Sequence, residues 1–248
     1  MDIVVCISSV PDTTSKINFI DNGKKFDTGG IQFVINPYDE FGLTKAMLLK
    51  ESMGGKVTVI TVGGAEVEPV IRKALAIGAD KAIRINMNAT DSYSTAFAIA
   101  NYLQENPMDL IITGRESIDY NGGAVGGMLA EMLDLPFINA CNGLEFSANT
   151  AKITREIDGG KENISVNLPF VIGGQKGLVQ ESELRIPNMR GIMQARTKPL
   201  QVVVPSNNET LTESINFEKP AKKGACKLVS SDNVAELVSL LHNEAKVI

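Results

Sequence analysis

Short runs of β-branched apolar residues alternate along much of the chain with longer segments of helical hydrophobic spacing. The apolar runs predict buried strands at 3–7, 57–62, 82–85, 110–113 and 170–172. The longer segments predict amphipathic helices at 39–53, 66–77, 91–104 and 127–133. Strands and helices that alternate in this way are joined by right-handed crossovers, so we expect an α/β fold with a mostly parallel, doubly wound sheet.

The later part of the chain follows a different pattern. Residues 151–167 alternate between apolar and polar side chains around an Asp-Gly-Gly turn, which predicts a hairpin. The composition becomes polar from about 205 to 224, as in an extended connector, and 233–244 has the spacing of an amphipathic helix. This helix packs either on the same chain or on a partner. We therefore expect an α/β nucleotide-binding domain over 1–205 and a connector with a helical C-terminal arm over 206–248.

The composition excludes several classes of function. One histidine and three widely spaced cysteines argue against a zinc site and against most histidine-based catalysis, and we expect no catalytic residue and no metal site. A net charge of −5 does not suggest a surface for nucleic acid. The apolar runs are too short to span a bilayer, and the N-terminal residues lack the features of a secretory signal. The cysteine usage fits a reducing compartment, so we expect a cytoplasmic protein without membrane insertion.

One candidate binding site lies where the expected parallel strands end, because open α/β sheets bind ligands at the carboxyl ends of their strands. Cys6 ends the first strand, 36–39 precede a helix, and the long loop 114–127 leads into another helix. This loop holds two Gly-Gly pairs, which let backbone N–H groups approach a ligand, and the helix N-terminus that follows favours an anion. A phosphate site and a tight turn fit the loop equally well. Val62 is placed either to cover a base or only to end its strand.

A second candidate surface is the segment 183–199. Basic and apolar residues alternate there, namely Arg185, Ile186, Met189, Arg190, Ile192, Met193, Arg196 and Lys198. An exposed loop with apolar side chains inside a basic ring suits docking to an acidic partner. The alternative is a solvated loop whose methionines belong to the core.

Several stretches of the chain resemble the beta subunit of electron-transfer flavoproteins. They are VVCISSVPDT, INPYDEFGLTKAMLLKE, VITVGGAEVEPVIRKALAIGADKAIRI, GRESIDYNGGAVGGMLAEMLDLP, TREIDGGKE and RIPNMRGIMQARTKP, and they follow the family's order from about residue 3 to residue 199. The combination of INPYDE, ALAIGAD, GRESID and RGIMQARTKP is highly specific. The stretch after Pro205 matches less clearly.

The resemblance implies a flavodoxin-like or adenine-nucleotide-hydrolase-like fold in a heterodimer. The alpha subunit would hold the redox FAD, while the beta subunit shares the FAD environment, binds AMP and packs its arm on the partner. Such a complex carries electrons from flavin dehydrogenases, typically the acyl-CoA dehydrogenases of fatty acid oxidation, to a quinone oxidoreductase or another acceptor. The AMP site would use Cys6, Asn36, Pro37, Tyr38, Asp39, Val62, Asp119, Asn121, Gly122, Gly123, Ala124, Val125, Gly126 and Gly127.

The same resemblance assigns roles in partner contact. Met189 stands at the position of an exposed leucine-type anchor that enters an apolar pocket on the dehydrogenase. The rest of the docking surface would be Arg190, Ile192, Arg196 and Lys198. The turn at Thr13 would lie near the flavin of the alpha subunit, and Arg155 and Glu156 near the subunit interface.

The phosphate loop departs from the family pattern. Many AMP-binding members carry Asn-x-Thr-Gly where this chain has Gly123-Ala124-Val125-Gly126, so phosphate contacts would fall to backbone N–H groups and to Asn121. A valine there resembles electron-bifurcating members, in which a second FAD replaces AMP and oxidises NADH. That branch often has a proline where this chain has Gly127, so we favour AMP and keep FAD at the same site as the alternative. A rival of another class, a stand-alone nucleotide-binding stress-type protein, needs neither a docking segment nor an arm.

Overall fold

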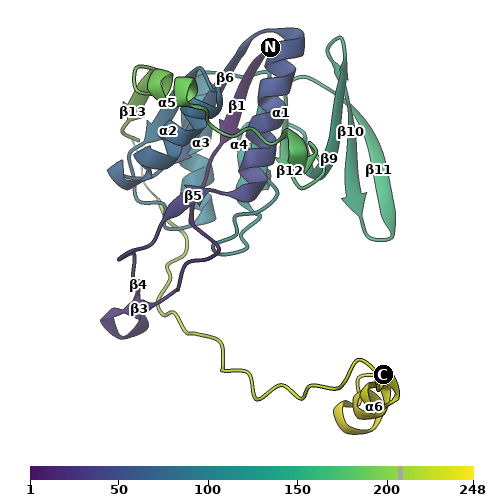
Figure 1. Ribbon diagram of the computed structural model, residues 1–248. Helices are drawn as coiled ribbons and strands as arrows, with labels where there is room; N and C mark the ends of the chain where they lie inside the picture. The colour runs from purple at the N-terminus through teal and green to yellow at the C-terminus, as the bar shows by residue number, and fades with distance from the viewer. Residues whose placement is uncertain (206–208) are drawn as a thin grey trace.

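A nine-stranded sheet lies at the centre of the molecule (Figure 1). The computed structural model describes residues 1–205 and 209–248, and in them the strand order is β11-β10-β9-β12-β8-β1-β6-β7-β13. The strands are β1 (Asp2–Cys6), β6 (Lys56–Val62), β7 (Lys81–Ile85), β8 (Leu110–Gly114), β9 (Phe137–Ser147), β10 (Thr150–Ile157), β11 (Gly160–Asn167), β12 (Phe170–Gly174) and β13 (Leu200–Val203). The strands from β9 through β12, β8, β1, β6 and β7 to β13 pair in parallel, whereas β10 pairs in antiparallel fashion with both β9 and β11. The predicted α/β fold with a mostly parallel sheet is confirmed.

Helices cover both faces of the sheet. The helices α1 (Pro37–Met53) and α2 (Glu68–Ile77) pack on one face, and α3 (Ser92–Glu105) and α4 (Val125–Met132) pack on the other. The alternating side chains of β1 illustrate why both faces need a covering layer. Ile3 and Val5 pack in the core beneath α1 and α2. Val4 and Cys6 pack in the core beneath α3 and α4. Full burial of each such aliphatic side chain stabilises the fold by about 1.5–3 kcal/mol, so a charge at Val4 would disrupt it. No helix in the described ranges is long and apolar enough to cross a bilayer.

Local sequence signals set several helix boundaries. The side chain of Asp91 caps α3 by accepting a hydrogen bond from the backbone N–H of Ser94 at 2.8 Å. Pro69 lies in the first turn of α2, where its missing N–H is not needed, and Gly78 ends that helix with a φ of 148°. Helix α4 begins at Val125, slightly earlier than predicted, because the glycines of the loop obscure its start.

A short excursion after β1 was not predicted from the sequence. It contains the strand pair β2 (Ser9–Pro11) and β5 (Phe33–Ile35), and the pair β3 (Phe19–Ile20) and β4 (Lys25–Phe26). These strands have two or three residues each, which is too short for a periodic pattern. In Figure 1 the excursion extends beyond the end of the central sheet, where it borders the site described below.

The chain after β13 leaves the sheet as an extended arm. Residues 209–233 contain no helix or strand, and α6 (Val234–Ser239) then continues into the π-helical turn η4 (Leu240–Ala245), away from the sheet (Figure 1). The predicted helix at 233–244 is thus confirmed, and its apolar side chains, such as Val234 and Val238, are exposed. Residues 206–208 of the predicted connector lie outside the described residues. The division into a domain over 1–205 and an arm over 206–248 stays a prediction.

The expected exposed loop at 183–199 contains a short helix that was not predicted, while most of its residues are exposed. Residues Met189–Ala195 form the helix α5, which is capped by Asn188 and packs against α2. A Cβ on Gly191 would lie only 2.3 Å from the carbonyl oxygen of Ala76, so the glycine lets the two helices approach closely. Seven residues with an internal glycine give too weak a helical pattern to be recognised from the sequence.

Candidate functional site

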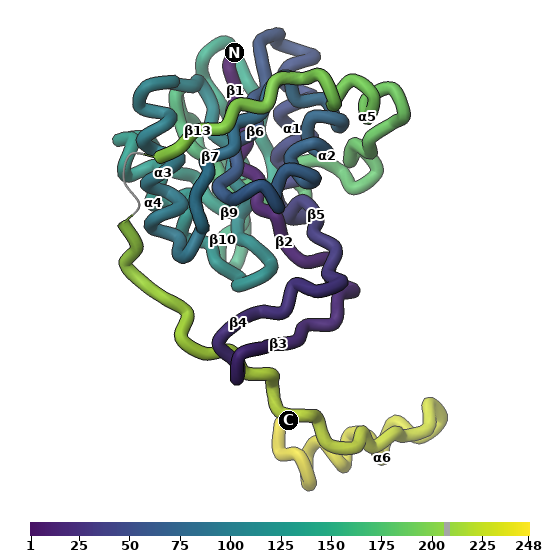
Figure 2. Tube along the Cα trace, turned by 90° about the vertical axis from the view of Figure 1, so that its left-hand side faces the viewer, coloured from purple at the N-terminus to yellow at the C-terminus, as the bar shows by residue number. Residues whose placement is uncertain are grey.

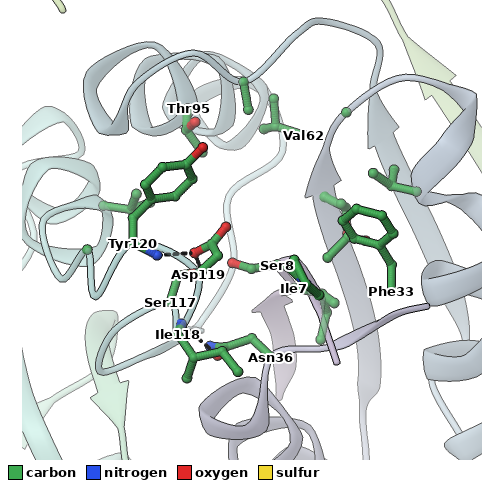
Figure 3. Close-up of a pocket in the computed structure, with 18 of the residues that line it drawn as sticks. Ile7, Ser8, Phe33, Asn36, Val62, Thr95, Ser117, Ile118, Asp119 and Tyr120 are labelled. Carbon is green, nitrogen blue, oxygen red and sulfur yellow. Dashed lines mark hydrogen bonds between the residues drawn. The ribbon is translucent and has the colours of Figure 1, made fainter. Parts of the chain in front are cut away.

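A cavity lies at the carboxyl end of β1, at the point where the order in which strands are added to the sheet reverses (Figure 3). The strands β6 and β7 follow β1 on one side, whereas β8 lies on the other side of β1. The loops that leave β1 and β8 therefore diverge, which is where open α/β sheets bind ligands. The cavity has a volume of about 900 Å³, and its lining includes Ser8 after β1, Val62 at the end of β6 and Glu116 after β8. This is enough for a nucleotide, because pockets for drug-sized ligands measure about 300–1,000 Å³.

Two buried polar side chains at the start of α1 connect the walls of this cavity. The amide of Asn36 donates to the carbonyl oxygen of Glu116 at 2.8 Å, and its Oδ1 accepts from the N–H of Ile118 at 3.3 Å. Asp39 accepts from the N–H of Ser8 at 2.7 Å and from the amide of Asn36 at 3.1 Å. Both side chains are thus occupied by protein partners. They fix the positions of the two loops and leave ligand contact mainly to the backbone.

Burial changes the ionisation of two groups at the floor of the cavity. It raises the pKa of Asp39 to about 7, against the lowering effect of hydrogen bonds from Ser8, Asn36 and Gly114. It also raises the pKa of the Cys6 thiol far above its ordinary value, and the charge of Asp39 adds to this effect. A thiol that keeps its proton is a weak nucleophile. We therefore interpret Cys6 as a wall of the cavity and not as a reactive group.

The loop between β8 and α4 presents backbone N–H groups to the cavity. Helix α4 begins at Val125 without a side-chain cap, so its first N–H groups remain free for an anion. A Cβ on Gly122 would meet no atom within 4 Å, which shows that this glycine faces open space. A Cβ on Gly123 would lie 3.1 Å from the carbonyl oxygen of Arg115, so this glycine packs more tightly. Neither glycine has a left-handed φ, so their role is close approach and not backbone strain.

The charge of the cavity lining is one-sided. The acidic lining residues are Asp12, Asp39, Glu66, Asp91, Glu116 and Asp119. No lysine, arginine or histidine is found among the described residues that border the cavity. A phosphate group bound there must rely on backbone N–H groups and hydroxyls. Each further negative charge on a ligand would meet repulsion from the carboxylates, so the cavity suits a ligand with few phosphates.

Most predicted ligand residues border the cavity. These are Cys6, Asn36, Asp39, Val62, Asp119, Gly122, Gly123, Val125 and Gly126. The predicted ligand residues that do not border the cavity are Pro37, Tyr38, Asn121, Ala124 and Gly127. Asn121 forms an exposed turn with a φ of 50°, Tyr38 lies beside the guanidinium of Arg115, and Gly127 packs near the ring of Phe137. Direct ligand contact by all the predicted residues stays a prediction.

Sequence reasoning overlooked two further walls. One is the region where β7 leads into α3, with Asn88, Ala89, Thr90, Asp91, Ser92, Thr95 and Ile99. The rule that located the other loops, the carboxyl end of a parallel strand, also applies to β7 and identifies this wall. The other wall combines Phe19, Phe26 and Phe33 of the excursion with Ser214 and Phe217 of the arm. Only tertiary contacts bring these segments together, so no local pattern predicts them.

The three large apolar side chains of helix α5 are exposed. Met189 is 75% exposed and Met193 is 68% exposed, so the alternative that these methionines belong to the core of this chain is excluded. Ile192 and Ile186 are exposed beside them, at 43% and 85%. These side chains form an exposed apolar patch, and the prediction that it docks a partner stays a prediction.

The basic residues around the patch are not equivalent. Arg190 and Arg196 are exposed, as predicted for a docking surface. Lys198 instead donates from its Nζ to the carbonyl oxygens of Leu75 at 2.9 Å and Ala79 at 2.7 Å, where it closes the C-terminus of α2. Burial lowers the pKa of Lys198. Lys198 thus has a structural role, and its predicted part in docking stays a prediction.

The remaining predicted contacts lie in two places. Thr13 borders the cavity. Arg155 pairs with Glu162 across the hairpin at 2.6 Å, and Glu156 accepts a hydrogen bond from Gln175 at 2.6 Å. The proposed positions of these residues at the flavin and at the subunit interface stay predictions.

Comparison with known proteins is consistent with this geometry. Residues 24–208 match the family model described as "Electron transfer flavoprotein domain". The chain is 38% identical to "Electron transfer flavoprotein subunit beta" of Bacillus subtilis, with 100% of both chains covered. It is 34% identical to the protein of the same name from Syntrophomonas wolfei, with 100% of this chain and 98% of the relative covered. It is 32% identical to "Electron transfer flavoprotein subunit beta, mitochondrial" of Oryza sativa subsp. japonica, again with 100% of both covered.

Proposed function

The chain belongs to the electron transfer flavoprotein family as a beta subunit, and from this premise we propose how it binds its cofactors and partners. Its role is electron transfer and not catalysis, and a beta subunit implies an alpha subunit as its partner. We propose a heterodimer in which FAD is held mainly by the alpha subunit and shared with this chain. Bound FAD supplies the group that accepts and donates the electrons. The exposed apolar side chains of α6 support a partner that covers the arm.

AMP is the ligand that we propose for the cavity. The observation that carries this proposal is the combination of free N–H groups at the start of α4 with a lining that has acidic but no basic side chains among the described residues. The N–H groups at Val125 and Gly126 would hold the single phosphate, and Val62 and Gly63 would cover the base. Neither task needs a catalytic group, which agrees with the protonated and inert thiol of Cys6.

A second FAD in the same cavity is the second candidate. Two observations favour it: Val125 stands where many AMP-binding members have threonine, and the cavity extends to an aromatic lobe with Phe19, Phe26 and Phe33. We prefer AMP because Gly127 stands where members with a second FAD often have proline. The acidic lining also disfavours the second phosphate that FAD would bring.

We propose that α5 docks the electron donor. Met189 and Ile192 would enter an apolar pocket on a flavin dehydrogenase, such as an acyl-CoA dehydrogenase, while Arg190 and Arg196 steer acidic surfaces towards it. The electrons would then pass to a quinone oxidoreductase or another acceptor. Truncation of a buried interface anchor costs about 1–3 kcal/mol, which corresponds to an affinity loss of roughly 5- to 150-fold.

The test is Met189→Ala in the assembled heterodimer, assayed by the rate at which a reduced acyl-CoA dehydrogenase reduces its flavin. Met53→Ala is the matched control, since Met53 is 42% exposed and lies at the end of α1, outside helix α5. We expect Met189→Ala to raise the dehydrogenase concentration needed for half-maximal transfer, with flavin content and Tm unchanged. Equal transfer rates in both variants and wild type would remove α5 from the docking surface.

A further inference from the structure

The arm segment 209–219 contributes two residues to the wall of the cavity. Ser214 and Phe217 of this segment are part of the cavity lining, although they are far in sequence from the other walls. In Figure 2 the segment runs from the side of the sheet past β3 and β4 before it reaches α6. It is attached to two walls of the cavity, at Asp91 and at Phe19, and the two attachments differ in chemistry.

Asp91 makes the first attachment. Its Oδ2 accepts hydrogen bonds from the backbone N–H groups of Leu211 at 2.8 Å and Thr212 at 2.9 Å, and from the hydroxyl of Thr212 at 3.4 Å. Its Oδ1 accepts from the N–H of Ser94 and thereby caps α3. One carboxylate thus joins the arm to the helix that forms a wall of the cavity. Hydrogen bonds to a charged acceptor are stronger than those to a neutral one.

Phe217 makes the second attachment. Its ring stacks on Phe19, with centroids 5.3 Å apart and planes 16° apart, and its N–H donates to the carbonyl oxygen of Gly23 at 2.7 Å. Lys219 adds a hydrogen bond from its Nζ to the side-chain oxygen of Asn18 at 2.7 Å. A Cβ on Gly23 would lie 2.8 Å from Asn216, so the absence of a side chain there lets the arm come this close.

We propose that the arm completes the nucleotide site, with Phe217 and Ser214 as its closing wall and Asp91 as the residue that positions them. This inference rests on the proposed binding of AMP in the cavity. In this arrangement the arm forms one wall around a ligand seated against the loop at Gly122 and the start of α4. Exchange of the ligand then requires this wall to open, so weaker attachment of the arm should speed release.

Two variants detach the arm in different ways. Asp91→Asn keeps an oxygen for the helix cap, because asparagine is also a good N-cap residue, but it turns an NH₂ group towards the two N–H groups of the arm. Phe217→Ala removes the aromatic stack and part of the wall. The matched controls lie outside the arm: Glu105→Gln, the same loss of charge at the exposed end of α3, and Met53→Ala, since Met53 is 42% exposed.

The experiment measures release of radiolabelled AMP from the heterodimer into an excess of unlabelled AMP. We expect release about 10- to 100-fold faster in Asp91→Asn, from the loss of charge-assisted hydrogen bonds, and about 3- to 10-fold faster in Phe217→Ala. Both controls should release AMP at the wild-type rate, and the FAD content and Tm of all variants should match wild type. Bound AMP should also slow amide hydrogen exchange at Leu211 and Thr212 in wild type and not in Asp91→Asn.

Failure of this inference differs from failure of the proposed function. Nucleotide extracted from the wild-type heterodimer decides first whether the cavity binds AMP, and if it holds FAD the same chase is run with labelled FAD. Wild-type release rates in both arm variants, with nucleotide bound, would overturn the role of the arm and leave the AMP proposal intact. A wild-type heterodimer that binds neither nucleotide would overturn both.

Discussion

Asn36 is the side chain whose loss should damage the cavity most directly. Asn36→Ala removes three hydrogen bonds at a residue that is only 1% exposed, and it leaves the carbonyl oxygen of Glu116 and the N–H of Ile118 without their partner. A buried polar group without a partner costs about 1–3 kcal/mol, and the long 3.3 Å contact to Ile118 belongs at the low end. The free energy of unfolding should therefore fall by about 2–4 kcal/mol. In a domain of this size that lowers Tm by about 4–16 °C.

The assay is a thermal melt of the heterodimer together with its AMP content. Asn36→Asp retains one acceptor oxygen but cannot donate to Glu116, and it places a second carboxylate beside Asp39, so we expect it to destabilise at least as much as alanine. Asn243→Ala on the exposed C-terminal turn is the control and should stay within about 0.5 kcal/mol of wild type. An Asn36→Ala protein that melts like wild type and keeps its AMP would refute the reasoning that this side chain holds the two loops together.

Three further predictions concern the same cavity. Because burial raises the pKa of Asp39 to about 7, the folded chain binds a proton that the unfolded chain releases, and the free energy of unfolding should fall as the pH rises from about 4 to 7, by up to about 1.4 kcal/mol per pH unit. Chemical denaturation across this range should show a smaller dependence of the free energy of unfolding on pH in Asp39→Asn. Gly122→Val should fill the open space and abolish AMP retention without a loss of Tm, whereas Gly224→Val, also without neighbours within 4 Å, should retain AMP; equal retention in both would place the ligand elsewhere. AMP should compete for the cavity better than ATP in equilibrium dialysis, because the lining has no basic side chain among the described residues, and tighter binding of ATP would contradict the charge argument.

The sequence is sufficient for the fold and for most of the cavity because both depend on short-range signals. The apolar run at Ile3 to Cys6 has no alternation, which only a strand covered on both faces explains. Asp91 and Gly78 mark helix boundaries by capping chemistry that depends on neighbouring residues alone. Once the strands are known, the carboxyl-end rule places the loops at Asn36 and at Gly122 side by side.

The remaining features depend on contacts between distant segments. Lys198 is basic and lies in a basic segment, so only the structure reveals that it caps α2. Phe217 stands alone in a polar stretch, and its stack on Phe19 needs a turn of the arm that no local pattern encodes. The helix α5 needs the surface of α2 as a support, since seven residues are too few for a stable helix in isolation. These are the places where tertiary structure overrides the local pattern.

Cofactor analysis of the purified heterodimer tests the central claim most directly. The chain is co-expressed with its alpha subunit, the complex is denatured, and the released FAD and AMP are quantified by chromatography and mass analysis against protein concentration. We expect a yellow heterodimer with one FAD and one AMP, and a colourless beta chain when it is expressed alone. A heterodimer with two FAD and no AMP would show that the cavity holds the second flavin and not AMP. Tight FAD on the isolated beta chain, or no flavin in the complex, would contradict the account.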